Sequence, residues 1–282
     1  PPSSAYTGRG GGLYVTHCGD GGDVIITSNI INWNGVGNTT SSSGAGAYLS
    51  NLKNLNLAHN LFVSNNYSLK HWIDGSALVL GVGMTANNID HNLFYSNYGN
   101  STVDVEGLTG ALTRNNFLEN EASYDLYIQH GNDIKIMNNF FSKDWVTSPP
   151  PSSDSQGDRG GISTHIYLTK GCGWPVADII NNTFALDVYA IWVDGDLDVS
   201  IKRNIFTEFA SEAIHIYNPP NDNVVISRNL FWNNASNGEA GTNYWVADPK
   251  LVDMANGDFH LMKGSAAIDK VPLGMVTSDI DY

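Results

Sequence analysis

The chain has 282 residues, with 14 Lys and Arg against 28 Asp and Glu, which gives a formal net charge of −14 at pH 7. General nucleic-acid binding requires a basic surface that neutralises phosphates, so this charge excludes it. For the same reason, acidic ligands would need a local basic group or a bound cation. The apolar runs fall short of the ~18 residues of a membrane helix, so no transmembrane segment is expected.

Residues 1–12, PPSSAYTGRGGG, are rich in Pro, Ser and Gly and predict a flexible lead-in. Alternation of apolar and polar residues begins at Leu13-Tyr-Val and continues through most of the chain. This alternation has period two, which is typical of strands, and no sustained helical stripe accompanies it. We therefore expect a single domain over residues 13–282.

A short pattern recurs within this domain: an alternating run leads into Asn, and an apolar residue follows two positions later. That residue is Phe in seven of eight units. The Asn residues that we assign to the pattern are Asn29, Asn60, Asn92, Asn115, Asn138, Asn182, Asn204 and Asn229. A basic period of 22 to 25 residues, stretched by insertions, is typical of a solenoid.

The repeated residues also indicate which solenoid. Stacked coils would place each Asn about 4.8 Å from its counterpart, so that each amide can donate and accept along the stack. A preference of Asn for turns would explain the Asn residues but not the Phe at a fixed offset. The pattern predicts an all-β fold, a single-stranded right-handed parallel β-helix (β-solenoid) of about eight to nine coils with Asn and Phe ladders.

Each unit also contains an earlier four-residue strand, such as Leu13-Tyr-Val-Thr16. If the first and third residues of each such strand point inward, the second and fourth residues form an outward face. The expected outward columns are Tyr14, Tyr48, Leu78, Asp104, Tyr127, Tyr167, Trp192, His215 and, beside them, Thr16, Ser50, Leu80, Glu106, Gln129, Thr169, Asp194, Tyr217. A solvent-facing column this rich in aromatic residues exceeds what solubility requires. It indicates a binding surface.

Two segments depart from the repeat. Residues 141–164 contain a Pro/Ser/Gly-rich stretch that predicts an inserted loop bordering the aromatic face. Residues 243–282 lose the Asn-Phe pattern and predict a C-terminal closing segment. At the other end, no helix precedes Leu13 to cover the first coil. An uncapped coil exposes strand edges, so we expect a covering segment or self-association through uncapped β-helix ends.

Over nearly its whole length the chain resembles the pectin-lyase-like right-handed parallel β-helix repeat proteins. The stretches Asp248-Pro-Lys-Leu-Val-Asp253, Gly257-Asp-Phe-His-Leu261 and Gly264-Ser-Ala-Ala-Ile-Asp269 resemble the closing segment of secreted β-helix proteins of choice-of-anchor Q type. The superfamily includes polysaccharide lyases, glycoside hydrolases, epimerases, phage depolymerases and non-catalytic surface proteins. The resemblance therefore implies the fold and leaves the chemistry open.

Acidic and basic residues gather at the centre of the outward face, which is the usual active site of the resembling enzymes. Candidate catalytic residues are Asp104, Glu106, His130 and Asp194, with Gln129, His165, Lys170 and His215 nearby. Such groups could serve a glycosidase, a lyase or an epimerase, or could simply solvate the surface.

The coil around His130 resembles the alginate and chondroitin lyase coil that carries an Arg-His-Gly triplet after a catalytic Lys. Here Gln129 stands in place of the Arg, and Glu106-Gly-Leu108 supplies no Lys. Without these cations, the charge that develops in that mechanism lacks its stabilising groups, which argues against a lyase of that type.

The aromatic column suggests a ligand with flat apolar faces and polar edges, such as a sugar. Candidate substrate-binding residues are Tyr14, Tyr48, Tyr127, Tyr167, Lys170, Trp192, His215 and Tyr217.

Metal and disulfide signals are weaker. Asp194, Asp196 and Asp198 offer oxygen ligands at a turn, as Ca²⁺ prefers, but do not match a twelve-residue calcium loop. Cys18 and Cys172 would lie about five coils apart, roughly 24 Å at ~4.8 Å per coil, so two separate buried thiols are expected.

Low Lys content, abundant Asn, Ser, Thr and Gly, and five Asn-X-Ser/Thr sequons are typical of an extracellular or cell-surface glycoprotein. We expect the protein to engage polysaccharide or another glycan along the outward face. The main alternative is a structural, self-assembling surface or filament-forming protein without catalysis. A second alternative is a polysaccharide-degrading glycosidase or lyase.

Overall fold

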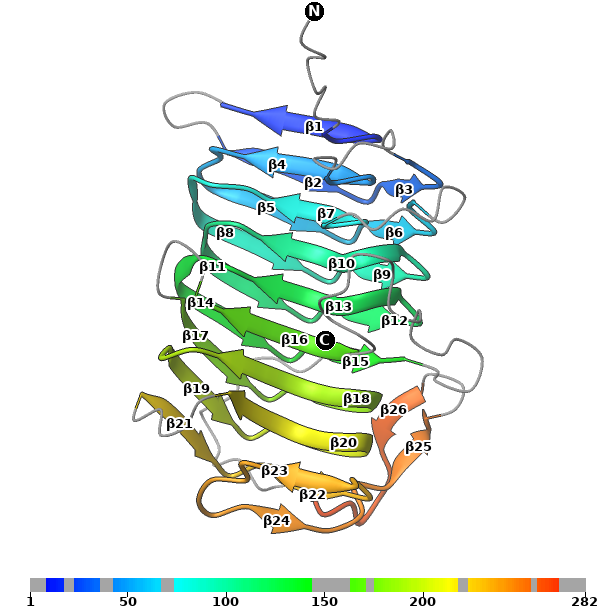
Figure 1. Cartoon of the computed structure of the whole chain (residues 1–282). Helices are drawn as coiled ribbons and strands as arrows, with labels where there is room; N and C mark the ends of the chain where they lie inside the picture. Colours follow the sequence, from blue (N-terminus) through cyan, green and yellow to red (C-terminus); the bar gives the residue numbers. More distant parts are fainter. Residues whose placement is uncertain are drawn as a thin grey trace, which may run out of the picture.

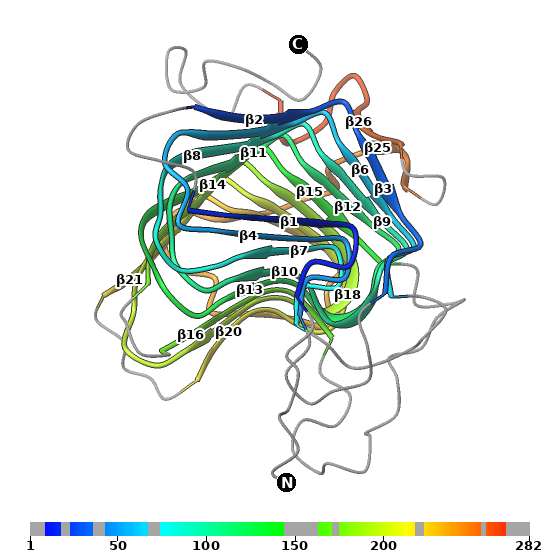
Figure 2. The ribbon, with the colours of Figure 1, turned by 90° about the horizontal axis from the view of Figure 1, so that it is seen from above.

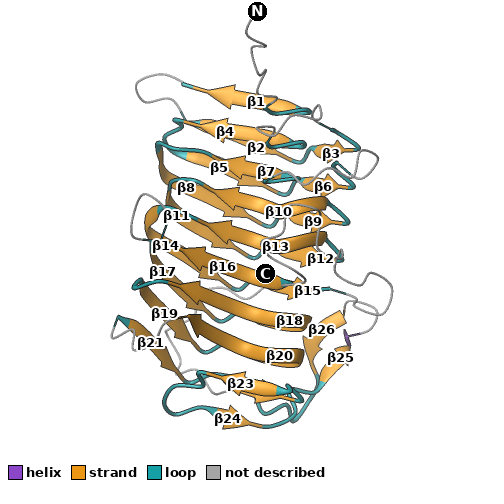
Figure 3. Cartoon of the chain, in the orientation of Figure 1, coloured by secondary structure: helices purple, strands orange, loops and turns teal. Residues whose placement is uncertain are grey.

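The computed structural model describes residues 9–17, 23–35, 43–66, 74–143, 163–170, 175–217, 223–254 and 258–268. These ranges contain strands and loops but no α-helix (Figure 3), and therefore no helix of a length and apolarity that could span a membrane. Both Cys residues, the lead-in residues 1–8, most of the predicted insertion and the tail from residue 269 lie outside the described ranges.

The strands stack as a right-handed parallel β-helix, which confirms the predicted fold (Figure 1). Each coil contributes one strand to each of three walls around a common interior (Figure 2). The described residues form eight complete coils and part of a ninth.

The first wall carries the expected outward face. Its strands are β1 (Leu13–Thr16), β4 (Ala47–Ser50), β7 (Leu78–Leu80), β10 (Tyr98–Val105), β13 (Glu121–Ile128), β16 (Thr164–Thr169) and the later parts of β18 (Thr183–Asp194) and β20 (Ile205–Tyr217).

The second and third walls complete each coil. The second wall comprises β2 (Val24–Thr27), β5 (Leu55–Ala58), β8 (Met84–Asp90), β11 (Leu108–Thr113), β14 (Gly131–Met137), β17 (Val176–Ile180), β19 (Asp198–Lys202) and β21 (Val224–Ser227). The third comprises β3 (Ile30–Asn32), β6 (Leu61–Val63), β9 (Leu93–Tyr95), β12 (Asn116–Leu118), β15 (Phe140–Ser142), the early parts of β18 and β20, and β22 (Leu230–Trp232).

Beyond the eighth coil, β23 (Ser236–Gly238) and β24 (Trp245–Val246) lie under β20 and β22. The chain then forms an antiparallel hairpin of β25 (Leu251–Asp253) and β26 (Asp258–Leu261) beside the third wall (Figure 1). Phe259 of this hairpin stacks on Phe140 of β15, with ring centroids 3.4 Å apart. The C-terminal segment thus packs against the stack instead of extending it.

Stacked phenylalanines form the predicted apolar column inside the third wall. Seven buried rings follow one another with centroids 4.7 to 5.2 Å apart and nearly parallel planes: Phe62, Phe94, Phe117, Phe141, Phe184, Phe206 and Phe231. Burying each ring contributes about 1.5 to 3 kcal/mol, so this column is a main source of stability.

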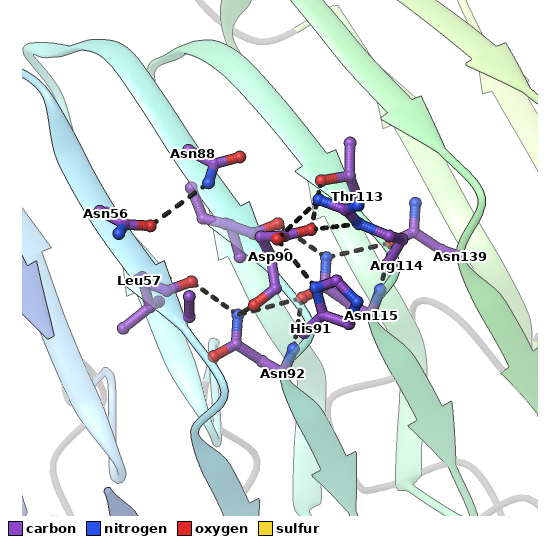
Figure 4. Close-up of polar contacts among 12 residues, drawn as sticks. Asn56, Leu57, Asn88, Asp90, His91, Asn92, Thr113, Arg114, Asn115 and Asn139 are labelled. Atoms are coloured by element: carbon purple, nitrogen blue, oxygen red, sulfur yellow. Dashed lines mark hydrogen bonds and ion pairs between the residues drawn. The ribbon is translucent and has the colours of Figure 1, made fainter. Parts of the chain in front are cut away.

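The Asn ladder runs along the corner before this column (Figure 4). The backbone N–H and the Nδ2 of Asn92 both donate to Oδ1 of Asn115, at 2.9 and 3.0 Å, and Asn115 donates in the same way to Asn139. Nδ2 of Asn115 also reaches the carbonyl of Ile89 at 2.9 Å. Each coil donates to the coil that follows it, so the ladder has a direction.

The fifth ladder residue is Asn139, and the predicted Asn138 is wrong by one position. Every ladder Asn follows a residue with positive φ, and Asn138 has φ of 56°. Asn tolerates this left-handed conformation better than most residues, so Asn138 forms the turn. Phe141 consequently joins the buried column, and Phe140 faces outward against Phe259.

The prediction of which residues point outward in the third coil, Leu78 and Leu80, is also wrong. Tyr48 pairs with Val79, and Val79 pairs with Asp104, so the outward residues are Val79 and Gly81. Leu78 and Leu80 belong to the core. The stretch Ala77-Leu-Val-Leu80 is apolar at every position, and alternation therefore cannot fix which residues point inward.

A second Asn ladder, which the sequence analysis missed, lies five residues after the first. It joins Asn34, Asn65, Asn97 and Asn120, with the same paired hydrogen bonds of 3.0 to 3.2 Å. Asn120, the last of these four residues, donates instead to Asp125 of the fifth coil, at 3.2 Å. In the coils that follow, charged side chains occupy the place of this second ladder.

Candidate functional site

The outward face of the first wall is assembled as expected outside the third coil. The pairing of successive strands aligns one column along the stack, namely Tyr14, Tyr48, Val79, Asp104, Tyr127, Tyr167, Trp192 and His215. The second column, from Thr16 to Tyr217, lies beside it. Residues more than 200 positions apart in sequence thus share one surface.

The tyrosines of this face stack on one another, which hides much of their surface. Tyr14 and Tyr48 lie 5.5 Å apart and nearly parallel, and Tyr48 is only 3% exposed. Tyr124, Tyr127 and Tyr167 form a second stack with centroids 4.7 to 5.4 Å apart. Parallel rings cover each other's faces and present their edges outward. Tyr48 and Tyr167, which is 6% exposed, are therefore packing residues as much as surface residues.

The stacking changes at the seventh coil. Trp192 is inclined by 65° to Tyr167 and by 70° to Tyr189, and its centroid lies 4.1 Å from that of His215. Tyr189, Trp192 and His215 are half-buried. No parallel ring among the described side chains covers Trp192. His215 is held by Glu212, whose Oε2 lies 2.6 Å from Nδ1.

Two carboxyls occupy the centre of the face. Asp104 and Glu106 are two residues apart at the end of β10, so their Cβ atoms lie about 6.5 Å apart on the same side. Asp104 is 1% exposed, and Gln129 donates to it at 3.3 Å, whereas Glu106 is half-buried.

The environment raises the pKa of both carboxyls. Burial raises the pKa of Asp104 well above its usual value, and the charges of Asp74 and Glu106 raise it further. Burial also raises the pKa of Glu106, although the positive charge of Arg9 opposes this shift. Carboxyls that hold protons at higher pH than usual can donate hydrogen bonds or protons.

The structure brings together three of the four candidate catalytic residues. His130 follows β13 in the next coil and is close enough to Glu106 to affect the pKa of that carboxyl. Its Nδ1 is buried, and no hydrogen bond reaches it from the described residues. Asp194 lies three coils below Glu106, about 14 Å away along the stack, and accepts a hydrogen bond from the Tyr167 hydroxyl at 2.9 Å.

The remaining candidates lie at the margins of the face. Tyr14 and Tyr217, at its two ends, are 51% and 50% exposed, and Lys170 is an exposed residue after β16. Asp196 and Asp198 are exposed beyond Asp194, and Asn223 donates to Asp196 at 3.2 Å. Calcium binding at these aspartates stays a prediction.

A buried group that was not predicted from the sequence consists of four residues of charged type, Asp125, Lys143, His165 and Asp187, which we call the charge quartet. His165 was expected on the outward face but is fully buried. Its Nδ1 lies 2.7 Å from Oδ2 of Asp125 and its Nε2 lies 2.9 Å from the carbonyl oxygen of Ala185. Both ring nitrogens therefore face oxygen atoms, one of a carboxyl group and one of the backbone.

Lys143 completes the quartet, with its Nζ 3.3 Å from Asp187 and 3.7 Å from Asp125. Oxygen and nitrogen ligand atoms of Asp125, His165 and Asp187 lie within 4.8 Å of one another, as metal ligands would. Nζ of Lys143 already places a positive charge beside the two buried carboxyls of this group.

The quartet joins the two sides of the predicted insertion. Lys143 precedes residues 144–162, and its Nζ donates to Oγ of Ser163, directly after them, at 3.2 Å. Asp187 lies five residues after Asn182, which is the offset of the second ladder. That offset was the signal in the sequence that could have revealed the quartet.

Comparison of the chain with models of protein families, with curated proteins and with solved structures gave no match. The parallel β-helix therefore rests on the structure itself, and kinship with pectin-lyase-like or choice-of-anchor Q proteins stays a prediction.

Proposed function

We propose that the protein binds a polysaccharide along the outward face of the first wall. The observation that carries this proposal is the half-exposed group of Tyr189, Trp192 and His215, whose rings lie 4.1 to 5.7 Å apart outside the tyrosine stacks. Sugar rings have apolar C–H faces and polar edges, and an indole ring flanked by polar groups suits both.

The spacing of the coils supports a ligand that runs along the stack. Neighbouring strands are about 4.8 Å apart, close to the length of one sugar residue in an extended glycan. Trp192 lies three coils from Glu106. A chain of about four sugar residues would therefore contact both, while the tyrosine edges offer hydroxyl groups between them.

Substitution of the indole tests the proposal. Trp192→Ala should weaken retention on the bound polysaccharide about tenfold, equivalent to about 1.4 kcal/mol, because it removes a half-exposed indole ring. Trp232→Ala is the matched control, since Trp232 is partly exposed on β22 in the third wall. Equal binding by the parent and both variants across a panel of neutral and acidic polysaccharides would contradict the proposal.

We propose glycoside hydrolysis at Asp104, Glu106 and His130 as a second candidate function. The observation that favours it is that two adjacent carboxyls have raised pKa values, as a general acid requires near neutral pH. Incubation with a polysaccharide that binds should release new reducing ends, and Glu106→Gln should abolish the release. Unsaturated ends would indicate a lyase instead, and the absence of new ends would exclude both activities for that polymer.

A further inference from the structure

The charges on the outward face are unevenly distributed. Carboxyl groups occur at both ends of the proposed binding region, with Asp74, Asp104 and Glu106 on one side and Asp194 and Glu212 on the other. These five residues come from the strands and turns of four coils. The face as a whole is therefore acidic where a glycan would lie.

Few basic groups among the described residues of this face offset these charges. Arg9 lies over the Tyr48 ring, with its guanidinium carbon 4.8 Å from the ring centre, and both Arg9 and His130 oppose the rise in the pKa of Glu106. Lys170 is exposed at the edge after β16, and His215 is engaged by Glu212 at 2.6 Å. The five carboxyls of the face thus outnumber Arg9 and Lys170, and an anionic ligand would meet more acidic than basic groups.

The central carboxyls already repel one another. Asp104 is buried between Val79 and Tyr127 in the outward column, with Gln129 as its neutral hydrogen-bond donor. Burial and the neighbouring Asp74 and Glu106 raise the pKa of Asp104. A further carboxylate or sulfate at contact distance would add to this repulsion, because the site is partly shielded from water.

We propose that the polysaccharide bound along this face is uncharged, and that Asp74, Asp104 and Glu106 exclude chains bearing uronate or sulfate groups. This inference rests on the proposed glycan binding and names its substrate class. Neutral sugars fit the available groups, because sugar hydroxyls can donate to the carboxyl oxygens and can both donate to and accept from the Gln129 amide and the tyrosine hydroxyls.

Matched pairs of oligosaccharides test this inference. The probes are oligomers of galacturonate, mannuronate and glucuronate and the same oligomers after reduction of their carboxyl groups to neutral sugars. At least one neutral form should bind tenfold or more tightly than its acidic counterpart, and Trp192→Ala should weaken that binding. The preference should shrink between about 0.01 and 1 M salt, over which the Debye length falls from about 30 to 3 Å.

A charge variant separates the local effect from the overall charge. Glu106→Gln should lower the ratio of the acidic to the neutral dissociation constant at least fivefold. Asp178→Asn, on β17 of the second wall, makes the same charge change away from the face and should leave the ratio unchanged.

The outcomes distinguish glycan binding by this face from its preference for uncharged glycans. An acidic oligomer that binds as tightly as its neutral form, with dependence on Trp192, would overturn the neutral substrate class and keep the glycan-binding face. Equal effects of Glu106→Gln and Asp178→Asn would show that net charge, not these carboxyls, sets the preference. Binding of neither form of any pair would overturn the proposed function and this inference together.

Discussion

The buried carboxyl of Asp104 lowers the stability of the folded protein when it ionises. Its pKa is raised in the folded protein, chiefly by burial, and stands above that of the same group in the unfolded chain. As pH rises above the ordinary value of 3.8, the unfolded chain loses its proton first, so the folded state binds more protons. Stability contributed by this residue therefore falls as pH rises from the ordinary pKa to the raised one.

Asp104→Asn should remove this pH dependence. The amide keeps the acceptor for Gln129 and carries no charge, so the variant should gain stability over the parent as pH increases. The gain is about 1.4 kcal/mol for each unit by which the folded pKa is raised. Denaturant unfolding between pH 4 and pH 8 measures it, and parallel stability profiles for the two proteins would contradict the argument.

At the level of elements, the Asn ladder fixes the register between coils. The structure assigns Asn139 to the ladder and Asn138 to the turn, which leads to opposite expectations for neighbouring residues. Asn139→Ala should cost several kcal/mol, because the donors of Asn115 lose their buried acceptor. Asn138→Gly should change stability little, since Gly adopts positive φ readily. Thermal melts of both variants decide the register, and the reverse order of stabilities would restore the sequence-based assignment.

The charge quartet ties β13, β16 and β18 together at the base of the insertion. Lys143→Met should cost about 3 to 5 kcal/mol, because it removes the ammonium group that lies beside the buried carboxyls of Asp125 and Asp187. The double variant Lys143→Met/Asp187→Asn removes one buried group of each sign and should recover part of the loss. A double-mutant cycle from unfolding curves measures the coupling, and additive effects would show that the two residues act independently.

The elements that the sequence predicted well are those in which repetition and residue type agree. The Phe column, most of the Asn ladder and the number of coils follow from the recurrence of Asn with Phe. Errors arose where neighbouring residues satisfy the same pattern in two registers, as in Asn138-Asn139-Phe140-Phe141 and the all-apolar Ala77–Leu80.

The candidate site was less predictable, because its properties depend on contacts between coils. Alternation placed Tyr167 on the outward side correctly, but its small exposed area results from stacking against Tyr124 and Tyr127. The charge quartet joins residues from both sides of an insertion, and no local pattern links Lys143 to Asp125. The proximity of Lys143 to Asp125 is determined by the packing of the coils and becomes visible only in the folded structure.

On the scale of the whole molecule, the two ends of the stack differ. Below the eighth coil, β23 and β24 continue the packing, and Tyr244 contacts the last Phe of the column with an edge-to-face geometry. In the first coil, β1, β2 and β3 each pair on one side only within the described part of the chain. Unpaired strand edges favour association with another chain.

Self-association should therefore increase with salt, because screening weakens the repulsion between chains of charge −14. Light scattering from low salt to 1 M measures this, with Val15→Lys as a variant that places a charge in the first coil. The variant should associate less than the parent. A constant mass of 30.5 kDa for the parent at every salt concentration would contradict the prediction.

The direction of the Asn ladder has a consequence for how such a chain can change length. Each internal Asn of the ladder accepts hydrogen bonds at Oδ1 from the Asn of the preceding coil and donates to the Asn of the following coil, so one internal coil can follow another. Removal of residues 92–114 would join His91, in its left-handed turn, directly to Asn115 and bring Asn65 above Asn120. Both ladders would close, whereas a deletion of half that length would move the later Asn residues out of line with the ladder. Insertions and deletions that preserve both Asn ladders must therefore add or remove whole coils.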